Sequence, residues 1–389
     1  MLELFRGAEA LTRAEVMARS GLSRSTVNQR IDALLQVGLI APAGEQLQPR
    51  GRPAERFAFN RGRGVLLVAD MGATGMRTGV CDLAGKVLGE RDCRIDLRLG
   101  PEALLATIDS EFDALLTAVG VEISAVMGVG LDVPGPVDFA RGQVVSPPIM
   151  SGWDRFDIRG WFGRRFTCPI LVENDVNAMA FGEQRIVYPD VTELLMLKIG
   201  TGVGAGLVTQ AGIFRGADGA AGDIGHLHAT NPSGDASPEP ACRCGRSGCV
   251  EAYAGGWALV RDLKTAGLDV EGVDDVVQLI RRGDLSAVNL MRQAARIIGE
   301  AIAQAVSLVN PSVIILAGQL SGAEEQLLAG VREVVYQRSL SLATQNLRIA
   351  RSKLDQRAGL IGLALLLADT LFAAPGVDQF VDLSLTAGR

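Results

Sequence analysis

The chain has 389 residues, of which 48% are hydrophobic, so it can bury a large core and form two or three domains. It contains no run of about eighteen uncharged apolar residues and no signal-peptide pattern, so we expect a cytoplasmic protein without a membrane partner. The formal net charge of −6 is unevenly distributed along the chain. Residues 1–63 carry ten arginines, no lysine and six acidic residues, which gives +4 against −10 for the remainder. A small basic head on an acidic body predicts that the head binds nucleic acid.

The head, residues 1–60, has the pattern of a winged helix-turn-helix. Thr12 and Glu15 can form a capping box at the start of a helix over 13–20, with Val16 and Met17 facing inward. A second helix over 24–36 follows the Gly21 turn and has apolar residues at helical spacing. We predict that this second helix contacts DNA. The polar residues around its start that suit base edges and phosphates are Ser23, Arg24, Ser25, Thr26, Asn28 and Gln29.

A wing is expected after the second helix, built from strands at 39–40 and 56–59. Between them, Arg50 and Arg52 flank a glycine in the segment Pro-Arg-Gly-Arg-Pro. Arginines held in an extended segment suit the narrow minor groove of A·T-rich DNA. A solvated linker is an equally good interpretation of five such residues.

In the body, two loops of small residues each follow a buried strand and precede a returning strand: Asp70–Thr74 and Gly200–Gly206. The repetition suggests a duplicated α/β fold with two lobes. Such loops offer backbone N–H groups and a threonine hydroxyl to phosphate, although the glycine loop alone is equally compatible with a tight hairpin. The candidate phosphate-binding residues are Asp70, Gly72, Thr74, Gly200, Thr201 and Gly202. The expected strands are 65–70, 78–81, 86–90, 126–133, 170–172, 194–199, 207–208 and 313–316, and the expected helices include 101–118, 176–184, 285–308, 323–336 and 358–372.

A cysteine-rich segment contains both histidines of the chain. Cys242, Cys244 and Cys249 are spaced C-x-C-x4-C among glycines, after His226 and His228. Thiolates this close in sequence with one imidazole predict a tetrahedral Cys3His zinc site. Three buried cysteines with incidental histidines are the weaker alternative, because the surrounding glycines suit neither a helix nor a strand. A closed four-ligand site would be structural, with one zinc per chain.

Several motifs together resemble the ROK family of sugar-dependent repressors and sugar kinases, over nearly the whole chain. They are Asp70-x-Gly72-x-Thr74, Pro134-Gly135-Pro136, Glu173-Asn174-Asp175, Gly200–Gly206, Gly222-Asp223-Ile224-Gly225-His226 and the C-x-C-G-x-x-G-C-x-E segment ending at Glu251. The winged helix-turn-helix ahead of them resembles the repressor branch.

The resemblance implies an α/β fold with an actin-like (ribonuclease H-like) two-lobed body of the sugar-kinase type. It also implies zinc held by His226 and the three cysteines, with His228 as the second choice, and a protein that is a homodimer or homotetramer. Asp175 would be the general base in a kinase. The sugar-binding positions that it implies are Asn174, Asp175, Asp223, His226 and Glu251. The chain then divides into a DNA-binding head (1–60), a first lobe (61–182) with the C-terminal helix as a candidate addition, and a second lobe (183–389) with the zinc loop and a dimerisation surface.

Four positions depart from the family pattern. Asp223 replaces a glutamate, and Ile149 replaces an asparagine that faces the sugar. Ala73 and Ala317 replace glycines near the phosphates and adenosine, so ATP and Mg²⁺ are not expected as cofactors. We therefore expect a sugar-responsive repressor of carbohydrate genes that binds a palindromic operator with A·T-rich flanks, rather than an enzyme. A sugar kinase with an additional domain and a constitutive regulator with a vestigial sugar site are the alternatives.

Overall fold

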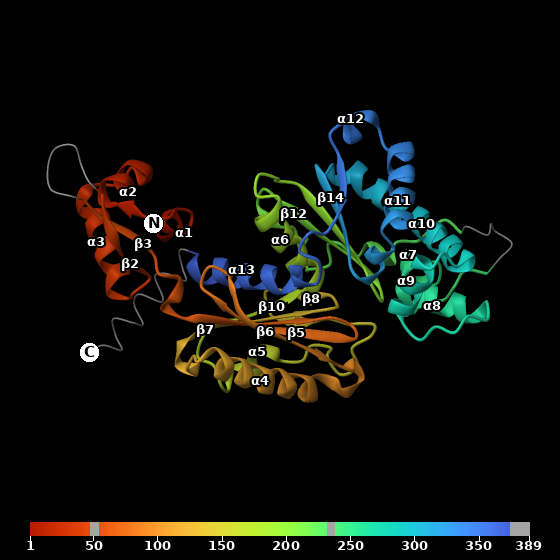
Figure 1. The fold of residues 1–389 in the computed structure, drawn as a ribbon, viewed down its shortest axis with the longest axis horizontal. Helices are drawn as coiled ribbons and strands as arrows, with labels where there is room; N and C mark the ends of the chain where they lie inside the picture. The colour runs from red at the N-terminus through yellow and green to blue at the C-terminus, as the bar shows by residue number, and fades with distance from the viewer. Residues whose placement is uncertain (47–53, 232–237, 374–389) are drawn as a thin grey trace.

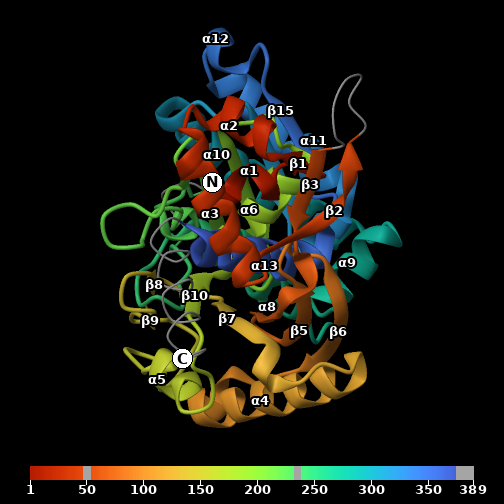
Figure 2. The ribbon, with the colours of Figure 1, turned by 90° about the vertical axis from the view of Figure 1, so that its left-hand side faces the viewer.

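The computed structural model describes residues 1–46, 54–231 and 238–373 (Figure 1). A small head lies at one end of a body that contains two five-stranded sheets. The head docks at one end of the last helix, α13 (Ala358–Phe372), as the two views show (Figures 1 and 2). No helix in the described ranges is long and apolar enough to cross a membrane.

The head has both predicted helices and the predicted wing. Thr12 accepts a hydrogen bond from the Glu15 backbone N–H, and Glu15 accepts one from Thr12, which confirms the capping box. Val16 is buried as expected, but the prediction for Met17 is wrong, because its side chain is 36% exposed. Two elements were not predicted because they are so short: the first helix is about one turn long, and the first strand has two residues. The elements are α1 (Leu2–Arg6), β1 (Leu11–Thr12), α2 (Arg13–Ser20), α3 (Arg24–Gln36), β2 (Ile40–Gln46) and β3 (Ala54–Phe59).

The first sheet has the strand order β10-β7-β4-β5-β6, with three parallel strands and an antiparallel extension. Alternate residues of its central strand face opposite sides: Leu67 packs in one core with α4, and Leu66 packs in another with α13. Helices on both faces are what buried parallel strands require. The elements are β4 (Val65–Met71), β5 (Gly75–Asp82), β6 (Val87–Arg94), α4 (Gly100–Val119), β7 (Val126–Val133), β8 (Val137–Asp138), β9 (Gln143–Val144), α5 (Ile158–Gly163) and β10 (Ile170–Asn174).

The second sheet has the order β13-β12-β11-β14-β15. Its predicted glycine loop is shorter than expected, because β12 already begins at Val203 and Gly204 and Gly206 belong to the strand. Glycine is needed inside this strand because a methyl group on Gly206 would lie 2.6 Å from the Val176 carbonyl oxygen of α6. The elements are α6 (Asp175–Val187), β11 (Leu194–Ile199), β12 (Val203–Thr209), β13 (Gly212–Ile213), α7 (Val250–Ala254), α8 (Gly256–Thr265), α9 (Val273–Arg281), α10 (Leu285–Val309), β14 (Val313–Ala317), α11 (Glu324–Arg338), α12 (Ser341–Thr344) and β15 (Arg348–Arg351).

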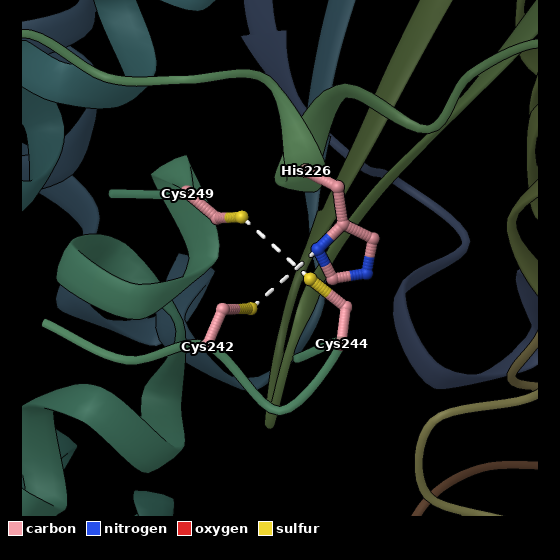
Figure 3. Close-up of side chains that lie close together, drawn as sticks. All are labelled: His226, Cys242, Cys244 and Cys249. Carbon is pink, nitrogen blue, oxygen red and sulfur yellow. Dashed lines mark hydrogen bonds between the residues drawn. The ribbon is translucent and has the colours of Figure 1, made fainter. Parts of the chain in front are cut away.

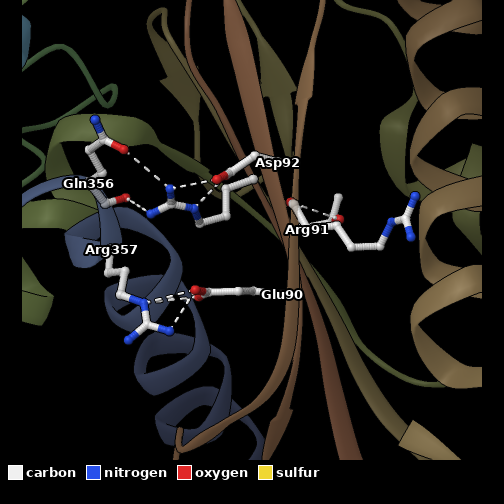
Figure 4. A network of polar contacts seen from close by, with 7 residues as sticks. Glu90, Arg91, Asp92, Gln356 and Arg357 are labelled. Atoms are coloured by element: carbon white, nitrogen blue, oxygen red, sulfur yellow. Dashed lines mark hydrogen bonds and ion pairs between the residues drawn. The ribbon is translucent and has the colours of Figure 1, made fainter. Parts of the chain in front are cut away.

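After β15 the chain returns to the first sheet through α13. Ion pairs fix the start of this helix against β5 and β6: Arg357 binds Glu90 at 2.6 Å, and Arg77 binds both Asp92 at 2.6 Å and the Gln356 carbonyl oxygen at 2.8 Å (Figure 4). The C-terminal helix therefore connects the second sheet to the first and ends beside the head.

Candidate ligand-binding residues and metal site

Asn174 and Asp175 lie where β10 ends and α6 begins. The Asn174 side-chain oxygen caps α6 by accepting hydrogen bonds from the backbone N–H groups of Val176 and Asn177 at 3.0 and 3.1 Å. Its amide nitrogen donates to the carbonyl oxygen of Gly135, in the predicted Pro-Gly-Pro turn, at 3.0 Å. The cap therefore fixes the side chain that sequence reasoning assigned to a sugar hydroxyl, and it places Asp175 in the first turn of the helix.

Asp175 forms an ion pair that sequence reasoning missed. The Lys198 ammonium, on β11, lies 2.5 Å from Asp175 Oδ2, and Asp175 is only 4% exposed. Burial lowers the pKa of Lys198, but the carboxylates of Asp175 and Asp70 outweigh burial and raise that pKa above the ordinary lysine value. The lysine thus stays charged at neutral pH. A lysine in the otherwise apolar strand Leu194–Ile199 was the available signal.

Asp70 and Asp132 extend the same cluster from the ends of β4 and β7. Burial raises the pKa of Asp70, and burial together with the Asp70 charge raises the pKa of Asp132 well above its ordinary value. Asp132 accepts a hydrogen bond from the Met71 backbone N–H at 3.1 Å through Oδ1, while its Oδ2 has no hydrogen-bond partner within the described part of the chain. Asp132 was not predicted, because it stands inside a strand motif with no loop glycine beside it.

We expect Asp132→Asn to stabilise the protein more at pH 8 than at pH 5. The folded protein binds the Asp132 proton more tightly than the unfolded chain, so this group loses stability as pH rises from about 4 through its raised pKa. Asparagine removes that loss, so its stabilising effect should be clearly larger at pH 8 than at pH 5. Urea unfolding at both pH values measures it. Asp92→Asn is the control: Arg77 lowers the pKa of Asp92, so this carboxyl is ionised in both states at pH 5 and pH 8, and the variant should change stability equally at the two pH values. A gain that is equal at both pH values would contradict the prediction.

The phosphate-loop candidates form two tight turns. The Gly72 backbone N–H donates to the Gly75 carbonyl oxygen at 2.8 Å, and the Gly200 N–H donates to the Gly202 carbonyl oxygen at 3.0 Å. Thr74 is exposed, and Thr201 is half-buried. Asp70 is the member of this set that lies with Asp175 and Lys198.

Glu251, Asp223 and His226 form a second group, whose hydrogen bonds and ion pairs involve other partners than those of Asn174 and Asp175. The Glu251 carboxylate accepts hydrogen bonds from the Val203 backbone N–H at 3.0 Å and from Trp257 Nε1 at 3.1 Å, which fixes it against the glycine turn. Asp223 Oδ1 lies 3.9 Å from His226 Nε2. The predicted sugar residues therefore come together as Asn174 with Asp175, and as Asp223 with His226 and Glu251.

A loop between the two groups is fixed by an ion pair that was not predicted. Glu173, on β10, is almost fully buried and accepts hydrogen bonds from Arg215 Nε at 2.8 Å and Nη2 at 2.6 Å. The Arg215 guanidinium also lies 3.8 Å from the centre of the Phe139 ring. Arg215 belongs to the segment that leads to Asp223, so this contact links the second group to the strand that carries the first.

Four ligand atoms converge at the predicted metal site. The side chains of His226, Cys242, Cys244 and Cys249 face one another, with their ligand atoms all within 4.8 Å of one another (Figure 3). Cys242 Sγ lies 3.6 Å from His226 Nδ1, and Cys244 Sγ lies 3.7 Å from Cys249 Sγ. Three sulfurs and one imidazole nitrogen fit the donor set of a tetrahedral zinc ion. His228 lies outside the cluster, where its Nε2 pairs with Glu239 at 2.8 Å.

The thiols of this cluster differ in acidity. Burial raises the pKa of Cys249 to about 12. Burial also opposes ionisation of Cys244, but hydrogen bonds from the backbone and side chain of Arg246 prevail and lower the pKa of Cys244 to about 7. Cys244 is therefore the thiolate most readily available to a metal.

The predicted DNA-reading face lies around the start of α3. Ser23, Arg24, Ser25 and Gln29 are exposed, whereas Asn28 is half-buried and accepts a hydrogen bond from Arg13 Nη1 at 3.2 Å. Thr26 is half-buried and shares a hydrogen bond with the Ser23 hydroxyl at 2.9 Å, which makes these two residues part of the helix cap. Arg50 and Arg52 lie outside the described residues.

A winged helix-turn-helix head on a body with two α/β sheets and a cluster of buried carboxylates is the arrangement of a regulator built on a sugar-kinase fold. Residues 67–370 match the model of the ROK family, and the chain belongs to this family. A putative xylose repressor of Caldicellulosiruptor sp. (strain Rt8B.4) is 27% identical over 94% of this chain and 93% of its own length. A ROK hexokinase structure from Thermus thermophilus is 30% identical, with a TM-score of 0.63, over 79% of this chain and 99% of its own. A ROK transcriptional regulator homologous to the Escherichia coli MLC protein shares the fold over 97% of this chain and 95% of its own, with a TM-score of 0.79 at 24% identity.

Proposed function

We propose that the protein is a sugar-responsive DNA-binding repressor of carbohydrate genes. The observation that carries this proposal is the head. The hexokinase covers only 79% of the chain, whereas the repressor relative covers 94% of it. Since the family match begins at residue 67, the winged helix lies ahead of the part that resembles a kinase.

On this proposal, two heads of a homodimer or homotetramer bind the half-sites of a palindromic operator, because a two-fold protein matches a two-fold site. The start of α3 enters the major groove, with Arg24, Ser25 and Gln29 reaching base edges. Asn28 contributes through its amide nitrogen, since its oxygen already accepts from Arg13. Arg50 and Arg52 favour A·T-rich flanks through the minor groove.

The sugar binds between the two groups of residues described above, and a structural zinc holds the second group in place. Carboxylates and an amide suit sugar hydroxyls, and Asn174 and Asp175 offer them from the start of α6. His226 Nδ1 faces the cysteines, while its Nε2 faces Asp223. A zinc ligand of this kind orients its neighbours through its second nitrogen, so the metal would stabilise the position of Asp223.

Sugar phosphorylation is the second candidate, because the hexokinase shares the body. Lys198 weighs against it. A general base must accept a proton from the sugar hydroxyl, and the Asp175 carboxylate is already engaged by an ammonium group at 2.5 Å. The methyl groups of Ala73 and Ala317 stand where the family has glycine, which opposes a close approach of backbone to ATP. We therefore propose that the protein does not phosphorylate sugars at a useful rate.

Selection of operator sequences from randomised duplexes, followed by sugar titration, tests the proposal. The full-length protein should enrich a palindrome, and one member of a panel of aldoses, N-acetylhexosamines and their 6-phosphates should change its affinity for that duplex. ATP-dependent phosphorylation of a panel sugar at ordinary kinase rates, without an enriched duplex, would establish the kinase instead. An enriched duplex that no sugar affects would indicate the constitutive regulator.

We expect Arg24→Ala and Gln29→Ala each to weaken binding to the selected operator by about 1–3 kcal/mol, because each removes a contact to a base edge. If Arg24 also contacts a phosphate, Arg24→Ala should make the operator affinity less dependent on salt concentration. Arg98→Ala is a matched control, since Arg98 is an exposed arginine of the body. Fluorescence anisotropy with the operator and a scrambled duplex measures both effects. Unchanged affinity in both head variants would show that α3 does not read the operator.

A further inference from the structure

The head is attached to the body by more than its chain connection. Leu2 and Phe5 of α1 belong to the same apolar cluster as Leu371 and Phe372 of α13. The Phe59 ring of β3 meets the Phe372 ring edge-on, with 5.5 Å between the centroids. The core of the head is therefore continuous with the last turns of α13, and a change in the position of this helix must affect how the head is held.

Asp369, in the last turns of α13, binds one arginine from the head and one from the body. Arg6 Nη2 of α1 lies 2.6 Å from Asp369 Oδ1, and Arg185 Nη2 of α6 lies 2.8 Å from Asp369 Oδ2. The Arg6 side chain is only 12% exposed and stacks near the Phe372 ring, 5.3 Å from its centroid. A partly buried, charge-assisted pair of this kind contributes more than the exposed ion pairs of an ordinary surface.

Arg185 connects this contact to the candidate sugar-binding residues at the start of α6. It lies in the last turn of α6, whose first turn carries Asp175. An α-helix rises about 1.5 Å per residue, so α6 is a short rigid rod from Asp175 to the contact with Asp369. At one end of the rod is the carboxylate held by Lys198, and at the other is the arginine that shares Asp369 with the head.

The two helices pack with their backbones in contact, so they move together. A methyl group on Gly362 of α13 would lie 1.8 Å from the Ala178 carbonyl oxygen of α6, and one on Gly182 would lie 2.6 Å from the Ala358 carbonyl oxygen. Without side chains between them, one helix cannot shift far without displacing the other. A displacement at the start of α6 therefore reaches the end of α13.

We propose that Asp369 is a positioning residue that couples the orientation of the DNA-binding head to the position of α6. When α6 shifts, the contact between Arg185 and Asp369 changes, and the carboxylate rearranges against Arg6 and the first helix of the head. The effect of these Asp369 contacts on operator binding rests on the proposed function, whereas the physical coupling of α6 to the head does not. Coupling of this kind requires that the ligand bind one arrangement better than the other.

Hydrogen exchange of the full-length protein, without DNA or sugar, tests the coupling. Arg185→Gln is the decisive variant, because Arg185 and Arg6 of the head bind the same carboxylate, that of Asp369. We expect amides of α1 to exchange about fivefold faster in this variant, a change that a residue acting only within the body would not produce. Asp369→Asn should accelerate exchange in both α1 and the last turn of α6. Arg357→Gln, the same change at the far end of α13, is the matched control: it removes an exposed ion pair, while the backbone packing on α6 keeps the helix in place, so α1 should be unaffected.

Unchanged exchange of α1 in Arg185→Gln, or equal acceleration in Arg357→Gln, would overturn the proposal. A second arm adds the selected operator duplex. DNA binding should slow hydrogen exchange in the first turn of α6 in the wild type, because coupling between two sites is reciprocal. The same exchange should not change when DNA binds Asp369→Asn. If DNA leaves hydrogen exchange in wild-type α6 unchanged, the head and α6 are not coupled, and the proposal fails. If the protein binds no duplex but passes the first comparison, the proposed function fails and the coupling stands.

Discussion

Cys249→Ser is expected to remove the bound zinc, from about one ion per chain to nearly none. Its thiolate is one of four converging ligands, and it stands at the start of α7, two residues before Glu251. Losing one of four ligands weakens the site, and because metal binding and local folding are linked, the loop should unfold as well. The sugar response should then disappear, since Glu251 and Asp223 lose their fixed positions. Elemental analysis and calorimetric sugar titration measure the two effects.

His228→Ala is the matched control for the metal site. His228 is the other histidine of the segment, is 67% exposed in its side chain and pairs with Glu239 rather than with the cysteines. This variant should keep both its zinc and its sugar response. If Cys249→Ser retained a full complement of zinc, or if His228→Ala lost it, the proposed ligand set would be contradicted.

Asp175→Asn is expected to lower the free energy of unfolding by about 2 kcal/mol at neutral pH. The change leaves the Lys198 ammonium without its closest partner, and breaking a fully buried pair costs about 3–5 kcal/mol. The smaller value applies because the Lys198 side chain is 25% exposed and Asp70 and Asp132 remain nearby. Urea unfolding measures the loss.

The double variant Asp175→Asn with Lys198→Met separates stability from function. Removing both charges should recover most of the lost stability, because a methionine fills a similar volume without an unpaired charge. It should not recover the sugar response, since the carboxylate that accepts the sugar hydroxyl is still absent. Equal stability of Asp175→Asn and the wild type would show that this ion pair does not form. Sugar phosphorylation by the wild type that Asp175→Asn abolishes would establish Asp175 as a catalytic base.

The contacts that fix the candidate site have no local signature in the sequence. Arg215 and Glu173 are 42 residues apart, and Lys198 meets Asp175 across two different elements. In the sequence, Lys198 stands out only as a charge in an apolar strand, and Arg215 as one arginine among many. Which carboxylate each cation meets depends on how the strands and loops assemble.

The sequence by itself indicated most of the longer elements and the cysteine cluster that could hold a metal, because both depend on short-range chemistry. The capping box of Thr12 and Glu15, the apolar spacing of α3 and the C-x-C-x4-C spacing all act within a few residues. The structure places His226, the first choice of the resemblance, beside the cysteines, whereas the tertiary structure alone decided that Lys198 pairs with Asp175 and that Asp369 binds both Arg6 and Arg185. The physical reason is that an ion pair depends on distance in space, and the two arginines on Asp369 are 363 and 184 residues from it along the chain.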